Sequence, residues 1–226
     1  TRLVKRVFDV LLSAVLIVIT APIMALIALA IKLDSPGPVI FKQWRIGENG
    51  RPFLMYKFRT MVDGAEHQLH QLIQYTEDGK PIHKHPNDPR VTRLGRFLRR
   101  SSLDELPQFF NVLKGEMSLV GPRPEVEPYV ALWAPTLREK VLSVRPGITG
   151  LTQIRYRHEE TLLAQQPDPE TYYREVLLPL KLQSDAEYVD RRTLLYDLSL
   201  ILRTLLALFE RPSDKRESVS HTQPQE

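Results

Sequence analysis

Hydrophobic residues are concentrated near the start of the chain. No charged residue occurs from Val10 to Ile31. At the rise of an α-helix this stretch would be roughly 33 Å long, enough to cross a hydrocarbon core of ~30 Å. Pro22 lies in its middle, where we expect it to break or kink the helix and leave two arms that are each too short to cross.

Two arrangements of this apolar stretch remain open. One is a spanning helix with a kink, and the other is a hairpin that enters one leaflet and returns. The hairpin accounts for Pro22 and for cationic flanks at both ends, where the positive-inside rule expects them at one end only. A buried core helix is a third alternative, and a cleaved signal peptide fits less well because no clear cleavage site follows. The flanking cations are Arg2, Lys5, Arg6, Lys32, Lys42 and Arg45.

Alternation typical of strands follows. Val39–Ile46 and Phe53–Arg59 are predicted strands, joined through the Asn-Gly turn signal at 48–50. The alternation places Lys57 and Arg59 on one face of the second strand. Two cations on one face indicate either a solvated edge or the lining of a site for an anion.

Helical periodicity returns further on. Arg90–Arg100 is predicted as a short basic helix, with Leu94, Phe97 and Leu98 on its apolar face. Tyr129–Leu142 is predicted as a helix interrupted at Pro135, with Trp133 available to anchor at a membrane interface.

The region Tyr172–Phe209 is predicted to be mostly helical. Its last part has an apolar face that either packs on a core or lies in the headgroup plane of a membrane, with Asp197, Arg203 and Thr204 on the opposite face. This apolar face comprises Leu194, Leu198, Ile201, Leu202, Leu205, Leu206 and Phe209.

Two polar segments complete the pattern. Residues 63–90 are predicted to be loop-like, and their histidines at 67, 70, 83 and 85 lack zinc-ligand spacing, so we interpret them as solvated. The tail from Arg211 is predicted to be disordered.

The composition of the chain indicates which classes of binding partner are favoured. The 226 residues carry a net charge of +4, which favours nucleic acid, phospholipid headgroups or phosphorylated substrates. The absence of cysteine excludes disulfides and thiol catalysis.

The candidate chemistry lies in residues 101–125. Adjacent Asp104 and Glu105 follow an arginine cluster that includes Arg99, and Arg123 sits in a stiff Gly-Pro-Arg-Pro turn. Guanidinium groups match phosphate oxygens geometrically, so carboxylates beside them suit phosphate chemistry. A simpler interpretation is that Ser102 or Asp104 caps a helix, which would place both acids at a helix N-terminus. A second rigid turn, Arg145–Gly150, also carries one arginine.

The sequence lacks the motifs that define several enzyme classes. The sequence has no P-loop, no Asp-x-Asp pair and no G-x-S-x-G elbow. Without cysteine, the leading covalent nucleophile is a carboxylate.

Seven ordered motifs between Lys5 and Phe209 resemble those of the bacterial sugar transferases, the monotopic phosphoglycosyl transferases that begin polyprenol-linked glycan assembly. The motifs are Lys5–Asp9, the Ser35-x-Gly37-Pro38-Val39-x-Phe41 segment, Tyr56–Met61, the Asp88-to-Arg96 segment, Leu103–Gln108, Met117–Pro124 and Arg145–Gly150.

The resemblance implies an α+β, mainly helical fold that is monotopic in the membrane. It implies a re-entrant helix-break-helix at residues 1–33, a catalytic domain at 34–210 that includes a small β-hairpin and amphipathic interfacial helices, and a tail at 211–226. Some family members have Ser-Pro at the helix break, whereas this chain has Ala21-Pro22, and Thr20 is the nearby hydroxyl that could substitute.

The resemblance also implies transfer of a sugar 1-phosphate from a UDP-sugar to polyprenyl (undecaprenyl) phosphate, with release of UMP and with Mg²⁺ as cofactor. Asp104 matches the family nucleophile and Glu105 its partner acid, and the pair is the predicted metal-ligand set. The predicted substrate- and phosphate-binding residues are Arg123, Lys57, Arg59, Arg99, Arg145, Pro122 and Pro124.

The predicted location is the bacterial inner membrane, with the catalytic domain on the cytoplasmic face. The predicted partners are the UDP-sugar, polyprenyl phosphate and membrane lipids, without nucleic acid, and a homodimer is left open. Two alternatives stand beside this prediction: a membrane-anchored module that binds anionic lipid or nucleic acid, and a polyprenyl-phosphate phosphatase.

Overall fold

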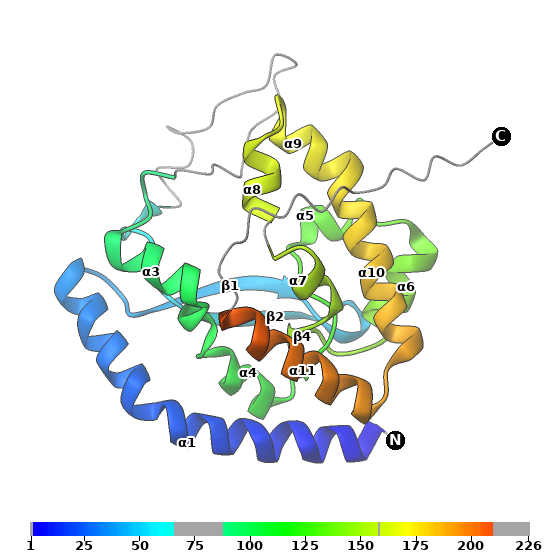
Figure 1. Ribbon diagram of the computed structural model, residues 1–226, viewed down its shortest axis with the longest axis horizontal. Coiled ribbons are helices and arrows are strands. Elements are labelled where there is room, and N and C mark those ends of the chain that lie inside the picture. Colours follow the sequence, from blue (N-terminus) through cyan, green and yellow to red (C-terminus); the bar gives the residue numbers. More distant parts are fainter. Residues whose placement is uncertain (1, 66–87, 158, 210–226) are drawn as a thin grey trace.

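The structure is a computed structural model that describes residues 2–65, 88–157 and 159–209. The predictions for the four histidines and for the tail from Arg211 lie outside these residues. The described part is mainly helical with a small antiparallel hairpin (Figure 1), as predicted for the fold class.

The N-terminal apolar stretch forms one helix, α1 (Arg2–Asp34), in which Pro22 is an interior residue. Of the predicted break or kink at Pro22, the break is wrong, because the helix is not interrupted, whereas the helix does bend about midway (Figure 1). The Thr20 hydroxyl donates to the carbonyl of Leu16 at 2.7 Å, so it does not bond the Val18 carbonyl that Pro22 leaves without its helical donor. Such back-bonding favours a bend in a helix.

The hairpin consists of β1 (Ile40–Ile46) and β2 (Pro52–Phe58), which pair antiparallel as predicted. The turn between them, Glu48–Gly50, includes Asn49 at φ 58°, a left-handed conformation that asparagine tolerates. Phe53 and Met55 are buried on one face of β2, and Lys57 follows on the same face by alternation.

Helix α3 (Arg93–Ser101) begins after Thr92, whose hydroxyl accepts a hydrogen bond from the Gly95 N–H. A Cβ atom at Gly95 would lie 2.0 Å from the Thr60 carbonyl oxygen, so only glycine lets α3 pack so closely on the segment after β2. Within its predicted apolar face, Leu98 is fully buried, whereas Phe97 is exposed.

The two acids lie in a short 3₁₀ turn, η2 (Leu103–Glu105), between α3 and α4 (Gln108–Lys114). The predicted helix cap is wrong. Ser102 ends α3 in a left-handed conformation and makes no side-chain capping bond, and α4 starts after Pro107 without a side-chain cap. The backbone reversal at Ser102 presents the acids to the interior of the molecule instead.

The two arginine-bearing turns lie side by side because the short strands before and within them pair in parallel, an arrangement that the sequence pattern did not predict. Strand β3 (Ser118–Val120) pairs with β4 (Gly147–Thr149). A Cβ atom on Gly147 would lie 2.0 Å from the Gly121 nitrogen, so the close approach requires glycine.

The remaining helices wrap around these strands. Trp133 follows α5 and is buried beside Tyr173, so its predicted role as a membrane anchor is wrong. The helical elements are α5 (Glu127–Val130), α6 (Pro135–Leu142), α7 (Leu151–Arg155), α8 (Glu159–Ala164), α9 (Pro169–Tyr172), the π-turn η3 (Tyr173–Leu177), α10 (Leu178–Arg191) and α11 (Leu194–Phe209).

Helix α11 turns its polar face inward. Asp197 and Leu200 are buried, and the Thr204 hydroxyl lies 2.6 Å from that of Thr149 on β4. Of the predicted apolar face, Ile201 packs on the core cluster that includes Leu200, whereas the leucines of this face are exposed, so the membrane alternative stays a prediction. Its exposed leucines are Leu194, Leu198, Leu202, Leu205 and Leu206.

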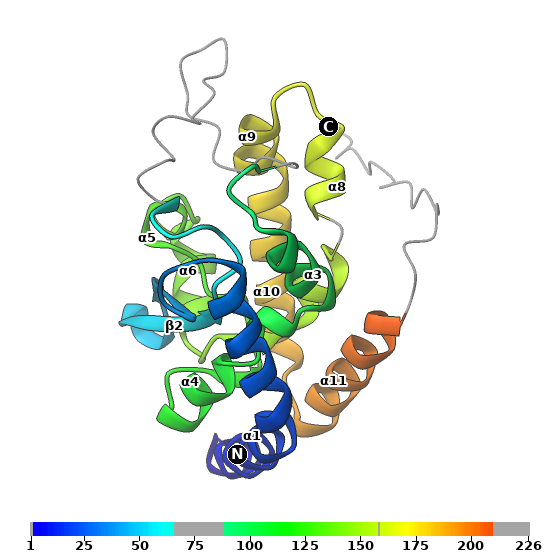
Figure 2. The ribbon, with the colours of Figure 1, turned by 90° about the vertical axis from the view of Figure 1, so that its left-hand side faces the viewer.

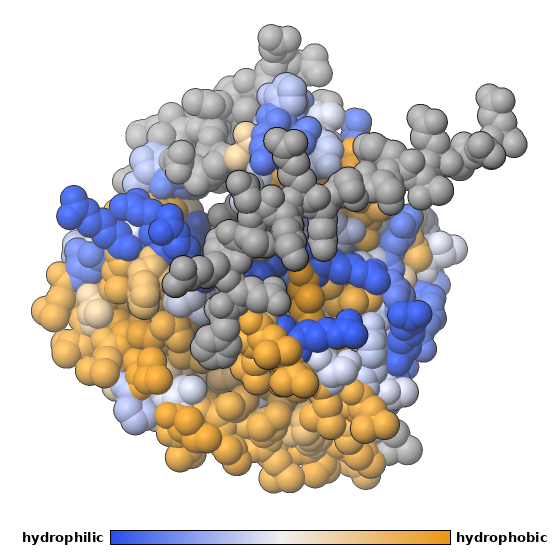
Figure 3. All heavy atoms as spheres, in the orientation of Figure 1, coloured by the Kyte–Doolittle hydropathy of each residue, from blue (hydrophilic) through white to orange (hydrophobic). Residues whose placement is uncertain are grey.

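The apolar sides of α1 and α11 belong to one side of the molecule. Most of α1 is unburied, and it is the one helix within the described ranges that is long and apolar enough to cross a membrane. In Figure 3 the hydrophobic surface gathers along the edge formed by α1 and extends to α11. This distribution is typical of a protein that contacts lipid through these helices.

A buried polar network fixes α1 to the rest of the fold. Lys5 Nζ lies 2.6 Å from Asp197 Oδ2 on α11, and the Ser118 hydroxyl donates to Asp9 at 2.8 Å. Tyr188 on α10 donates to the other oxygen of Asp197 at 2.8 Å. Each buried carboxylate therefore has hydrogen-bond partners, as burial of charge requires. The predicted domain boundaries at 33 and 210 stay predictions.

Candidate active site

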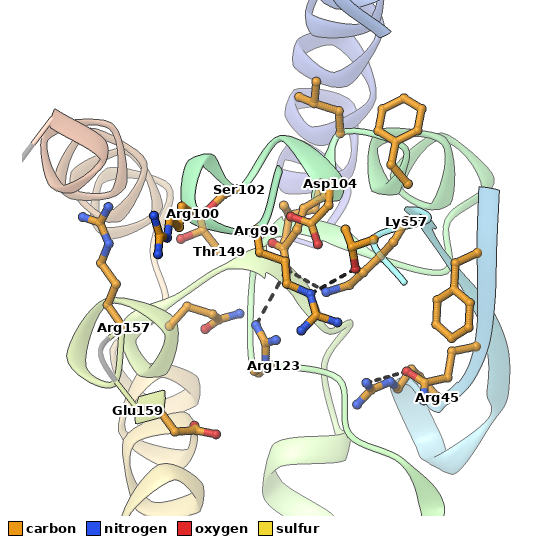
Figure 4. Close-up of a pocket in the computed structure, with 18 of the residues that line it drawn as sticks. Arg45, Lys57, Arg99, Arg100, Ser102, Asp104, Arg123, Thr149, Arg157 and Glu159 are labelled. Carbon is orange, nitrogen blue, oxygen red and sulfur yellow. Dashed lines mark hydrogen bonds and ion pairs between the residues drawn. The ribbon is translucent and has the colours of Figure 1, made fainter. Parts of the chain in front are cut away.

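A cavity of about 2090 Å³ lies between α1, the hairpin, α3 and the C-terminal helices. Figure 4 shows its centre, with Asp104 and Lys57 on one side and Arg123 facing them. The predicted residues that line it are Asp104, Glu105, Lys57, Arg59, Arg99 and Arg123.

Asp104 is held in a largely dry environment. Only 8% of the residue is exposed, at the point where η2 meets the cavity. Burial raises the pKa of Asp104 from 3.8 to about 6, against the opposing influence of the Lys57 charge. At that pKa the carboxylate is roughly nine-tenths ionised at pH 7 and is more basic than an exposed aspartate.

Glu105 has the opposite electrostatic environment. Burial disfavours its charged form, but Lys57 and Arg123 outweigh it and hold the pKa of Glu105 below its ordinary value. Lys57 Nζ lies 2.9 Å from Glu105 Oε1, and Arg123 Nη1 lies 4.0 Å from the same oxygen. Adjacent carboxylates with pKa values moved in opposite directions are typical of sites where the two acids have different roles.

Two further predicted arginines approach the cavity differently. Arg99 on α3 donates from Nε to the Thr60 hydroxyl at 3.0 Å, which orients its guanidinium in the cavity (Figure 4). Arg59 is buried and donates to the carbonyls of Pro36 and Ser35, at 2.5 and 2.9 Å. Arg59 therefore fixes the loop that follows α1, and much of its donor capacity is used there.

The structure does not bring three of the predicted residues into this cavity. Arg145 does not line it, and its Nε lies 3.4 Å from Glu48 Oε2 in the hairpin turn. Pro122 and Pro124 line a small hollow beside Trp133 instead. Their positions indicate that they stiffen the turn that presents Arg123.

Sequence reasoning missed a network of buried charges behind Arg123. Arg45 on β1 lies 3.3 Å from Glu125, and Lys181 on α10 lies 3.8 Å from Glu125 and 2.7 Å from Glu159. Glu105 and Glu125 raise the pKa of Arg123 although burial opposes this. Glu125 directly follows the Pro-Arg-Pro turn, and this position could have indicated that it lies near the site. Nothing in the helical pattern distinguished Lys181.

The predicted metal ligands are the two acids alone. The described residues contain no group of three or more His, Cys, Asp or Glu side chains that could hold a metal ion. Mg²⁺ commonly takes one or two carboxylates and completes its shell with substrate phosphates and water. Because Lys57 already neutralises Glu105, Asp104 and the phosphates of a bound substrate are the donors that fit such an ion.

The fold and the cavity together define a class of protein: one with a cationic, carboxylate-containing cavity, which suits a phosphorylated ligand, next to an exposed apolar surface. The chain belongs to the bacterial sugar transferase family, whose family model matches residues 1–211.

Curated relatives cover most of the chain. It is 37% identical over 210 residues to the UDP-glucose:undecaprenyl-phosphate glucose-1-phosphate transferase of Escherichia coli (strain K12). The aligned region covers 92% of this chain and 40% of that protein. The enzyme of the same name from Caulobacter vibrioides is 39% identical, over 90% of this chain and 69% of that enzyme. The exopolysaccharide production protein ExoY of Rhizobium meliloti is 36% identical, over 90% of this chain and 84% of that protein. The chain thus spans about two-fifths of the E. coli relative.

Proposed function

We propose that this protein transfers a sugar 1-phosphate from a UDP-sugar to undecaprenyl phosphate, or a similar polyprenyl phosphate, and releases UMP. The names of the relatives support the two substrates. The observation that carries the mechanism is Asp104, a buried carboxylate with a raised pKa that opens onto a cavity lined by Lys57, Arg99 and Arg123. Buried acids with perturbed pKa values beside cations are typical of catalytic sites.

The first step uses Asp104 as the nucleophile. An oxygen of the ionised carboxylate attacks the phosphorus that bears the sugar, and the bond from that phosphorus to the bridging oxygen of the diphosphate breaks. UMP leaves with the bonding electron pair, and the sugar phosphate stays on Asp104 as an acyl phosphate. Arg123, Arg99 and Lys57 are placed around the cavity to bind phosphate oxygens and the charge that develops on them.

The second step regenerates the carboxylate. A phosphate oxygen of the polyprenyl acceptor attacks the same phosphorus, forming a new P–O–P linkage while the bond to Asp104 breaks. Ionised Glu105 adjoins the nucleophile and is bound to Lys57. It either accepts a proton from the lipid phosphate or helps to hold the metal.

A bound Mg²⁺ ion would neutralise the diphosphate and orient it for in-line displacement. Asp104 and the phosphates of the bound donor would hold it, and Glu105 would join them only by giving up its ion pair with Lys57.

We also propose that α1 is re-entrant in the inner membrane and that the catalytic part faces the cytoplasm. The bend at mid-helix and the exposed apolar sides of α1 and α11 support this placement. Nucleotide sugars are water-soluble, whereas the acceptor is a lipid, so a cavity between a polar body and an apolar surface suits both substrates.

Quenched mixtures of enzyme and UDP-sugar, without acceptor, test the covalent step. We expect a burst of UMP close to one equivalent of enzyme, and a sugar-phosphate adduct on the peptide that contains Asp104. Asp104→Asn should abolish both. Asp34→Asn, which changes an exposed aspartate outside the cavity, is the matched control and should retain both.

Other outcomes would contradict the proposal. UMP that appears only after acceptor is added, with intersecting initial-rate lines, would show direct transfer. Release of inorganic phosphate from polyprenyl phosphate would show a phosphatase. Binding of anionic lipid without turnover would show a binding module.

A further inference from the structure

The cavity continues beyond the carboxylates into a passage between α1 and α11. Leu12 and Leu16 line it from α1, and Ile201 and Leu205 line it from α11. The two helices are joined near their first turns by Lys5 and Asp197, and Figure 2 shows that they diverge from that end. Leu205 lines the cavity and is also 51% exposed, so the cavity opens laterally beside α11 toward the apolar side of the molecule.

The outer border of this opening is hydrophobic on both helices. Leu11 and Val15 on α1 are 62% and 52% exposed, and Leu198 and Leu202 on α11 are 43% and 58% exposed. Figure 3 shows this region within the hydrophobic surface. A ligand that enters here therefore crosses an apolar border before it reaches polar groups.

The inner border of the opening is cationic. Arg100 and Arg157 line the cavity, and Figure 4 places both on the side of α11, away from Lys57. Within the described residues neither guanidinium forms an ion pair with a carboxylate. The Thr149 and Thr204 hydroxyls, 2.6 Å apart, line the same cavity. Two like charges beside one cavity repel each other, and a bound anion would relieve that repulsion.

We infer that this passage binds the lipid acceptor of the proposed reaction. Its first isoprene units lie between Leu16 and Leu205, and its phosphate contacts Arg100 and Arg157. The inference rests on the proposed function for the identity of the lipid. A phosphomonoester carries close to two negative charges at neutral pH, whereas the phosphodiester of a common phospholipid carries one. A pair of guanidiniums therefore matches polyprenyl phosphate better than it matches bulk lipid.

A pair of neighbouring substitutions tests the passage. Leu205 is 51% exposed and lines it, whereas Leu206 is 57% exposed and does not, so Leu205→Glu and Leu206→Glu place the same charge on the same helix at similar exposure. The dissociation constant of radiolabelled polyprenyl phosphate is measured for each protein in nanodiscs. Leu205→Glu should weaken binding about tenfold or more, because it places a carboxylate in an apolar passage that leads to a phosphate site. Leu206→Glu should stay within about twofold of wild type.

The arginines are tested by the double variant Arg100→Gln/Arg157→Gln. We expect weaker binding of polyprenyl phosphate and a shallower dependence of that binding on salt concentration, because two phosphate contacts are lost. Phosphatidylglycerol should compete poorly with polyprenyl phosphate on the wild type. Equal competition by phosphatidylglycerol, or equal effects of the two leucine substitutions, would overturn the inference.

The donor half-reaction separates this inference from the proposed function. If Leu205→Glu keeps the UMP burst but binds acceptor weakly, both stand. If the wild type gives no burst while the selective loss of binding in Leu205→Glu persists, the covalent mechanism fails and the acceptor passage stands. If the burst is present and Leu205→Glu binds acceptor as Leu206→Glu does, the passage fails alone.

Discussion

The substitution Asp104→Asn should make the protein more stable at neutral pH while it abolishes turnover. Asp104 has a pKa of about 6 in the folded protein and 3.8 as the reference for the unfolded chain. A raised pKa means that the folded state binds the proton more tightly, so above pH 6 it must hold a charge that burial disfavours. The difference of 2.2 units corresponds to about 3 kcal/mol of destabilisation at pH 7.5. Asparagine removes this charge and keeps the shape.

Because ionisation of Asp104 destabilises the fold, the stability gained by Asp104→Asn should depend on pH. The destabilisation by ionised Asp104 is fully present above the folded pKa and disappears as the pH falls toward the unfolded one. The advantage of Asp104→Asn should therefore fall from about 3 kcal/mol at pH 7.5 to about 1.6 kcal/mol at pH 5. For a chain of this length, the value at pH 7.5 corresponds to an increase in Tm of about 6 to 12 °C.

Thermal unfolding of detergent-solubilised protein at pH 7.5 and pH 5 measures both values. Asp34→Asn, an exposed aspartate, serves as the control and should change stability by no more than about 0.5 kcal/mol at either pH. An Asp104→Asn variant that is less stable than wild type at pH 7.5 would refute the reasoning. An increase in Tm of the same size at pH 5 would refute it as well, because the gain would then not come from removing a charge.

Three other changes test separate parts of the site. Arg123→Lys should reduce kcat/KM at least about tenfold although it keeps the charge, because lysine lacks the paired donors of the guanidinium; near-normal kcat/KM would make Arg123 a structural turn residue. Lys57→Met should move the acid limb of the pH–rate profile upward by about one unit, since Lys57 lowers the pKa of Asp104; an unchanged limb would show that another group titrates. Single cysteines at Leu3 and at exposed Arg51, in a chain that has no cysteine, should react with an impermeant reagent from the same side of the membrane. Labelling from opposite sides would contradict a re-entrant α1.

The sequence was sufficient to predict the elements whose signals are local. The hairpin was predicted to within one residue at each end, because strand alternation and the Asn-Gly turn are both local. The basic helix α3 was predicted for the same reason. The parallel pairing of β3 with β4 was not predicted, because each strand has only three residues and the pairing depends on close contact between two distant glycines.

The candidate site shows the same division. Asp104, Glu105, Lys57, Arg59, Arg99 and Arg123 were predicted, and the structure places all six around one cavity. The environment of the acids was mispredicted, because the αL conformation of Ser102 replaces the expected helix cap and its dipole. An aspartate at a helix N-terminus would have a lowered pKa, whereas burial in the η2 turn raises it. Burial depends on contacts between distant segments, which a local pattern does not report.

The position of α1 is coupled to the geometry of the site through two hydrogen bonds and a short stretch of chain. Asp9 accepts hydrogen bonds from the Ser118 hydroxyl and from the Leu119 N–H, at 2.8 and 3.3 Å. Strand β3 ends at Val120 and leads directly into the turn that holds Arg123. Because the buried Asp9 is on α1 and Arg123 lies 4.0 Å from Glu105, the proposed insertion of α1 into a membrane would set the height of the proposed phosphate-binding groups above the apolar surface. In the proposed reaction a soluble donor and a lipid acceptor must reach the same carboxylate, so this connection would hold the two routes to Asp104 at a fixed distance from each other.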